Sequence, residues 1–199
     1  MRVEDLDQHP QFCRLAGLQG VAVDLRYASA NNFAGRSLYG SLDCAWLRLE
    51  AAQALQTAAA WLAQQRPGWQ LLVLDALRPQ RAQEAAWQIV AGTPGEDYFA
   101  DPARGSIHSW GMAVDVTLLN PADLEVDMGS PFDAMDEVSH PELHLELLAS
   151  GRLLPAHVAQ RELLQQAMAQ GGFAGIPNEW WHFDLGQRDR VRRELPRVD

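Results

Sequence analysis

The sequence predicts an α+β fold, built as a single domain over residues 1–199. Two stretches, residues 20–28 and 112–118, alternate apolar and polar residues as half-buried strands do. Between them, residues 47–65 repeat apolar residues at helical spacing. A chain of 199 residues with 47% hydrophobic content is long enough to bury one sizeable core.

The first half of the chain begins with the strand expected over residues 20–28, which the Asn-rich turn at residues 31–35 breaks. The alanine-rich residues 47–65 predict a long helix, stopped by a Pro-Gly pair. A short apolar run at residues 70–74 then indicates a buried strand that ends at Asp75.

A second helix is expected from Pro79 to about Val90, because proline suits the first helical position. Arg78 precedes this proline and is therefore pushed out of helical geometry, with its guanidinium pointing away from the helix surface. Residues 92–105 carry two Pro-containing turns and predict a long loop, and loops of this length tend to be functional.

The second half begins with the strand of residues 112–118, followed by an irregular stretch over residues 120–140. A helix after Pro155 is expected to end at a Gly-Gly pair. Its predicted core residues are Val158, Leu163, Leu164 and Met168. An aromatic run at residues 180–185 indicates a last strand, with Glu179 at its entry.

Composition excludes several classes of partner. The net charge of −10 repels phosphate backbones and anionic lipids, so neither nucleic acid nor membrane is an expected partner. The N-terminal residues are acidic and lack the apolar run of a secretory signal, and two cysteines, Cys13 and Cys44, are too few for a disulfide framework. We expect a cytoplasmic protein, and the sequence does not indicate its oligomeric state.

Four residues have the chemistry of a zinc hydrolase centre. A catalytic zinc takes three nitrogen or oxygen ligands and leaves one position open, which His108, Asp115 and His182 could satisfy. Glu179 could then act as the base that takes the proton of the attacking water. Taken singly, each has an ordinary alternative: a packed or surface histidine, a strand-end aspartate, a solvated glutamate. Their combination predicts one zinc ion per chain.

The spacing of these residues demands irregular backbone. Asp115 lies on the less apolar face of its strand, whereas His108, seven residues earlier, would face the opposite side of an unbroken strand. Gly111 is the residue that permits the required kink. Glu179 and His182 are three apart, which also places them on opposite faces of an ideal strand.

Two motifs carry a family resemblance. The serine, histidine, glycine and aspartate pattern of residues 106–115 and the Glu-Trp-Trp-His run of residues 179–182 resemble the D-alanyl-D-alanine dipeptidases of the vancomycin-resistance type, which are zinc peptidases. The resemblance extends from about Val21 to Asp184. It implies an antiparallel sheet that carries the zinc site, with helices packed around it, and hydrolysis of D-alanyl-D-alanine to two D-alanine molecules.

The resemblance also implies a role for Arg78. The run from Asp75 to Pro79 is similar to the family's Asp-x-Tyr-Arg-Pro segment, whose arginine stabilises the oxyanion of the tetrahedral intermediate. This chain has Leu77 where the tyrosine commonly stands, so a hydrogen bond from that position is not expected. Considered alone, an arginine at a strand-to-helix junction is usually a surface ion pair.

Three further residues are implied to bind substrate. Residues 128–137 closely resemble the family's Met-Gly-Ser-x-Phe-Asp-x-Met-Asp-Glu segment, whose first aspartate, here Asp133, receives the substrate ammonium. Ser106 matches a serine that binds the substrate carboxylate, and Tyr27 matches a tyrosine whose segment lines the substrate site. From the residues alone, Tyr27 could be strand packing and Asp133 part of a solvated acidic turn.

The sequence leaves two alternative functions open. One is a related zinc peptidase that acts on other dipeptides or on cell-wall stem peptides. The other is a catalytically silent zinc-binding module that recognises peptide ends. Glu179 argues against the silent module, because a structural zinc site has four closed ligands and needs no base.

Overall fold

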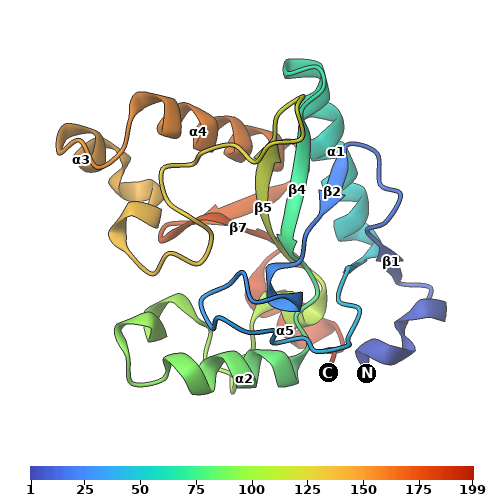
Figure 1. Ribbon diagram of the computed structural model, residues 1–199. Helices are drawn as coiled ribbons and strands as arrows, with labels where there is room; N and C mark the ends of the chain where they lie inside the picture. Colours follow the sequence, from blue (N-terminus) through green and yellow to red (C-terminus); the bar gives the residue numbers. More distant parts are fainter.

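A five-stranded sheet forms the centre of the computed structural model, which describes residues 1–199 (Figure 1). Its strands, in spatial order, are β2 (Val21–Val23), β4 (Gln70–Asp75), β5 (Ala113–Leu119), β7 (Glu179–Leu185) and β6 (Phe173–Ile176). Strand β2 pairs with β4 in parallel, and the other three pairings are antiparallel. The predicted α+β class is confirmed, and strands β5 and β7, which carry Asp115 and His182, make only antiparallel pairings.

The main core lies on one face of this sheet. Helices α1 (Leu49–Gln65) and α4 (Pro155–Gln170) contact each other there and bury their apolar residues against the sheet. Strand β5 shows why the two faces differ, since Val114, Val116 and Leu118 join this core while Asp115 and Thr117 alternate to the other face. The polar face is therefore the one available for chemistry.

Shorter elements surround the sheet. Strands β1 (Phe12–Arg14) and β3 (Trp46–Arg48) form a separate antiparallel pair. The remaining α-helices are α2 (Gln80–Val90), α3 (His144–Ala149) and α5 (Arg188–Glu194). The 3₁₀ helices are η1 (Val3–Gln8), η2 (Arg26–Ala28), η3 (Pro94–Tyr98), η4 (Ile107–Trp110), η5 (Glu137–Ser139) and η6 (Pro141–Leu143).

The two chain ends lie side by side, as Figure 1 shows, and the amide of Val3 donates to the carbonyl of Asp199 at 2.7 Å. None of the helices combines the length and the apolar character needed to cross a lipid bilayer.

Several element boundaries differ from those predicted. The strand expected over residues 20–28 ends at Val23, because Tyr27 enters the 3₁₀ helix η2 and packs into a second apolar cluster with Tyr39 and Leu77. Residues 46–48 pair as strand β3 instead of opening helix α1. Strand β6 was not predicted, and Leu163 is half-buried, whereas Val158, Leu164 and Met168 are buried as expected.

Candidate metal centre and substrate cavity

Three acidic or imidazole side chains form a row across the polar face of the sheet. The register pairs Asp75 on β4 with Asp115 on β5, and pairs Asp115 with His182 on β7. His108 joins them from η4, the turn that precedes β5. Gly111 ends this turn with φ of 68°, a left-handed conformation that glycine adopts without steric cost, and so redirects the chain into β5. The predicted kink at Gly111 is confirmed.

The side chains of His108, Asp115 and His182 converge on one point. Nε2 of His108 lies 3.1 Å from Nδ1 of His182, and these two nitrogens lie 3.3 Å and 3.0 Å, respectively, from Oδ1 of Asp115. Ligand atoms of a tetrahedral zinc, at about 2.0 Å from the metal, are separated by about 3.3 Å. The three buried donor atoms therefore have the spacing of one face of such a tetrahedron.

Hydrogen bonds fix which ring nitrogen of each histidine faces this point. His108 Nδ1 is 2.7 Å from the carbonyl of Ala76, which can only accept, so the ring donates there. His182 Nε2 is 2.9 Å from Oδ1 of Asp184, whose other oxygen is bonded to Arg188. In its neutral form, each ring thus directs a lone pair at the shared point, as metal-ligating histidines do. Asp184 was not singled out in the sequence, although its position two residues after His182 places it on the same strand face.

The carboxylate of Asp115 is ionised in this setting. Burial opposes its ionisation, but the imidazoles of His108 and His182 outweigh burial and lower the pKa of Asp115 below its ordinary value. An anionic oxygen beside two imidazole nitrogens is a donor set that suits zinc among the common metals.

A bulge in β7 brings Glu179 to the same site. Gly175 pairs with Phe183 but the next residue, Ile176, pairs with Glu179, so extra residues of β7 are inserted between these two pairs. Because of this bulge, Glu179 and His182 face the same site although they are three residues apart in the strand, and Oε2 of Glu179 lies 4.0 Å from Nδ1 of His182. Burial raises the pKa of Glu179 to about 7. A carboxyl group with this pKa can accept and release a proton near neutral pH.

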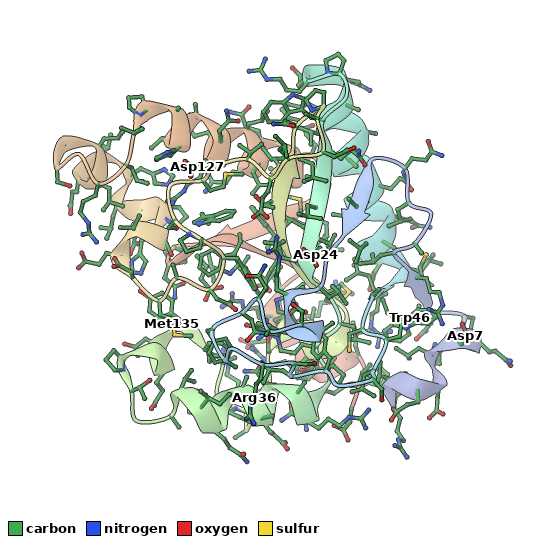
Figure 2. All side chains as sticks on the ribbon, in the orientation of Figure 1. Asp7, Asp24, Arg36, Trp46, Asp127 and Met135 are labelled. Carbon is green, nitrogen blue, oxygen red and sulfur yellow. The ribbon has the colours of Figure 1, made fainter.

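A cavity of about 340 Å³ opens beside these groups. Its lining includes all the candidate site residues except Tyr27, namely Arg78, Ser106, His108, Asp115, Asp133, Glu179 and His182. Residues 97–101 and Met135 also line it, and Figure 2 shows Met135 beside the segment of η3. The sulfur of Met135 packs so closely on Gly95 that a Cβ added to this glycine would lie only 2.5 Å away. Two loops that are distant in sequence thus meet at the cavity.

Arg78 is buried within the site rather than paired at the surface, so the surface ion-pair alternative is wrong. Its Nε donates to Oδ2 of Asp75 at 2.9 Å and its Nη1 to Oε1 of Gln83 at 3.0 Å, while Nη2 lies 3.4 Å from Oδ2 of Asp115. Tyr39 donates its hydroxyl to the other oxygen of Asp75. Sequence reasoning missed Gln83 and Tyr39, since neither belongs to a motif that the sequence displays.

Tyr27 lies beneath the cavity and contacts two of its lining residues. Its hydroxyl donates to Oδ1 of Asp133 at 3.1 Å, and the guanidinium of Arg78 lies 4.8 Å from its ring centroid. Tyr27 is 1% exposed, so it packs as a buried residue and also holds Asp133. Strand packing is the wrong alternative in detail, because Tyr27 lies in η2 and not in β2, and the substrate-site role implied by the resemblance stays a prediction.

Asp133 projects its carboxylate into the cavity from a left-handed backbone conformation, with φ of 61°. Oδ2 accepts a long hydrogen bond of 3.4 Å from the amide of Phe33. Burial, followed by the charge of Asp115, raises the pKa of Asp133 to about 8. Asp133 is thus not a fully solvated acid, and a cation beside it would favour its ionised form.

The His-Asp-His cluster with an adjacent carboxyl group in a cavity is the arrangement of a metal-dependent hydrolase. Residues 10–198 match the peptidase M15 family described as D-ala-D-ala dipeptidase, and the chain belongs to this family of metallopeptidases. It is 39% identical to the D-alanyl-D-alanine dipeptidase of Escherichia coli K12 over 165 residues, which cover 83% of this chain and 79% of that protein.

Two further relatives share this name. The D-alanyl-D-alanine dipeptidase of Enterococcus faecium is 32% identical over 186 residues, covering 84% of this chain and 87% of the relative. That of Streptomyces coelicolor is 32% identical over 188 residues, with the same coverage of 84% and 87%. The family resemblance predicted from the two motifs is confirmed.

Proposed function

We propose that this metallopeptidase hydrolyses D-alanyl-D-alanine to two D-alanine molecules, using one zinc ion held by His108, Asp115 and His182. The observation that carries the proposal is the position of Glu179, a carboxyl group beside the three donor atoms in a cavity that also exposes Asp133. The family and the names of the relatives support the same substrate.

The donor set suits zinc, and the bound ion would supply positive charge that lowers the pKa of water and polarises the scissile carbonyl. Glu179 would take a proton from the attacking water and later deliver it to the leaving amine, the task for which a pKa of about 7 is suited. Arg78 lines the cavity and would hold the negative charge that develops on the carbonyl oxygen. Asp75 and Gln83 hold the guanidinium in place for this role.

A free dipeptide carries an ammonium and a carboxylate about 5–7 Å apart, judged from residue dimensions. Its binding site must therefore offer a negative and a positive group at a similar separation. Asp133 would receive the ammonium. Ser106 would bind the carboxylate, since it occupies the N-cap position of η4 while its side chain makes no capping hydrogen bond there. Arg104 and Arg192 line the cavity beside it, and Arg192 Nη2 donates to the carbonyl of Gly105 at 3.0 Å. This end of the cavity is suited to an anion.

The size of the cavity favours a small substrate. A volume of about 340 Å³ lies at the lower end of the range of about 300–1,000 Å³ that is usual for small-ligand sites. A longer peptide would present an uncharged amide to Asp133 and would forgo the ion pair that the free ammonium makes there. These features favour a dipeptidase over a carboxypeptidase.

The proposal is tested by assaying release of D-alanine from D-alanyl-D-alanine before and after removal of metal with a chelator. We expect turnover by the zinc-loaded protein, loss of turnover after chelation, and recovery when zinc is restored. L-alanyl-L-alanine and a stem pentapeptide serve as comparison substrates. Efficient cleavage of either, with little action on D-alanyl-D-alanine, would assign the protein to another substrate. Zinc binding without any hydrolysis would favour the silent peptide-end module.

A further inference from the structure

Arg161 on helix α4 is a completely buried arginine that makes no ion pair with a carboxylate. Its donors instead reach backbone and hydroxyl oxygens. Nε donates to the carbonyl of Met128 at 2.7 Å, Nη1 to that of Val138 at 2.9 Å, and Nη2 to the hydroxyl of Ser130 at 3.1 Å. His144 lies at 3.4 Å from Nη1. A buried charge is costly unless its hydrogen bonds are satisfied, and here oxygens of one loop satisfy most of them.

These bonds close the loop of residues 128–138 at both ends. Met128 and Ser130 lie at the start of the loop and Val138 at its end, so one guanidinium holds the two ends of the loop together. Asp133 lies between them. Its left-handed backbone is sparsely populated for residues other than glycine and persists only when the surroundings hold it. Arg161 is placed to supply that restraint from behind the cavity.

The same network reaches the strand of the candidate base. The hydroxyl of Ser130 also accepts a hydrogen bond of 2.9 Å from Nε1 of Trp180, the neighbour of Glu179 on β7. The indole of Trp180 lies 5.7 Å from the guanidinium of Arg161. Ser139 adds a hydrogen bond of 2.6 Å to the carbonyl of Ala134, next to Asp133. The loop that carries Asp133 is thus tied to the strand that carries Glu179.

We propose that Arg161 is a positioning residue that sets the place of Asp133 relative to Glu179, and so governs recognition of the substrate ammonium. The inference rests on the proposed dipeptidase function. Arg161 does not line the cavity and touches no reacting atom, so its effect is transmitted through the 128–138 loop. An arginine suits this task better than lysine, because its planar fork can bond to several oxygens at fixed angles.

The surface offers a matched control. Arg152 also binds this region, through Asp136 at 2.7 Å and Glu137 at 2.9 Å, but its side chain is 41% exposed. Exposed ion pairs contribute little, so Arg152→Met removes a tether to the same loop without removing the buried restraint. Asp127, which lies near the start of this loop and is labelled in Figure 2, contacts His157 at 3.3 Å and does not depend on either arginine for this contact.

The experiment measures kcat and KM of wild type, Arg161→Lys and Arg152→Met on D-alanyl-D-alanine and on its N-acetyl form, together with zinc content and thermal unfolding. We expect Arg161→Lys to lose at least about tenfold in kcat/KM on the free dipeptide, chiefly through KM, since misplacement by about 1 Å can cost this much or more. Slow cleavage of the capped compound and the zinc content should stay within twofold of wild type. Arg152→Met should match wild type on both substrates.

Equal losses on the free and capped substrates, or unchanged kinetics in Arg161→Lys, would overturn the positioning role. Ser130→Ala provides a second variant if Arg161→Lys does not fold, because it removes the hydroxyl that Arg161 and Trp180 share and leaves the other hydrogen bonds of the arginine in place. It should raise KM for the free dipeptide at least threefold, and an unchanged KM would count against the proposal. Wild-type protein that does not cleave D-alanyl-D-alanine would instead refute the proposed function. In that case, calorimetric binding of D-alanyl-D-alanine and its N-acetyl form to the same variants would decide the role of Arg161.

Discussion

Asp115 and His182 face each other directly across strands β5 and β7, with Nδ1 of His182 3.0 Å from Oδ1 of Asp115. Sheet hydrogen bonding therefore fixes the spacing of these two groups before any ligand arrives. Only His108 comes from a turn, and its ring is held by the carbonyl of Ala76. A site preformed in this way loses little conformational freedom on binding a metal, which favours affinity.

The ligand set predicts that His182→Ala abolishes stoichiometric zinc binding, because two donors and an open face cannot replace the three-ligand site. Elemental analysis of purified protein measures the zinc content directly. His140→Ala is the matched control, since His140 bonds to Tyr98 at 2.8 Å and is not a ligand in our proposal. Retention of zinc by His182→Ala at the wild-type stoichiometry and affinity would show that the ligand set is wrong.

Removing the charge of Asp184, the hydrogen-bond partner of His182, should weaken zinc binding without abolishing it. Asp184→Asn keeps the size of the side chain but removes the negative charge that orients and polarises the imidazole. We expect zinc affinity to fall about 10- to 100-fold, the usual effect of losing such a partner. Competition with a chromophoric chelator measures the affinity. Affinity equal to that of wild type would mean that the charge of Asp184 does not act on the metal site.

Glu179→Gln is expected to keep the fold and the zinc but to lose at least about 100-fold in kcat, because an amide cannot accept a proton from water. Zinc content and the unfolding temperature are measured beside turnover, so that loss of metal is distinguished from loss of the base. If kcat stays within a few-fold of wild type, another group must act as the base.

The sequence predicted much of the site because its residues lie in two compact motifs. The fold class, the kink at Gly111 and the convergence of His108, Asp115 and His182 all follow from local pattern and from ligand chemistry. The bulge that turns Glu179 toward His182 could not be predicted, since it depends on how β7 pairs with β6, a strand that the sequence did not reveal.

The sequence also did not predict the residues that hold other site residues in place. Tyr39, Gln83 and Arg161 each bond to a residue of a recognised motif, but none of the three lies in a motif itself. Their side chains are ordinary in sequence, and only burial beside a charged or constrained group reveals their role. Their roles depend on contacts made in the folded chain, which residue type alone does not predict.

Arg78→Ala is expected to lower kcat by more than it raises KM, because the oxyanion exists fully only in the transition state. Loss of a preorganised donor of this kind commonly costs about 10²- to 10³-fold in kcat. Arg78 also contacts Asp115, so zinc content must be measured with the kinetics. A change confined to KM, with zinc retained, would assign Arg78 to substrate binding instead.

Asp133 allows the sharpest test of substrate recognition. If its carboxylate pairs with the free ammonium, N-acetylation of the substrate removes the positive charge and adds bulk where the carboxylate lines the cavity. N-acetyl-D-alanyl-D-alanine should therefore be a very poor substrate of the wild-type protein. Efficient cleavage of the capped compound would contradict the dipeptidase proposal and favour a carboxypeptidase or an endopeptidase of the same family.

Asp133→Asn completes the comparison, because it removes the charge while nearly preserving shape. We expect kcat/KM for the free dipeptide to fall at least about tenfold, since hydrogen bonds between charged groups contribute about 1.5–3 kcal/mol. The already low value for the capped compound should change little, as that compound never makes the lost interaction. Assays of both proteins on both substrates form a complete double-mutant cycle. A loss that is equal for the two substrates would mean that Asp133 supports the cavity wall without binding the ammonium.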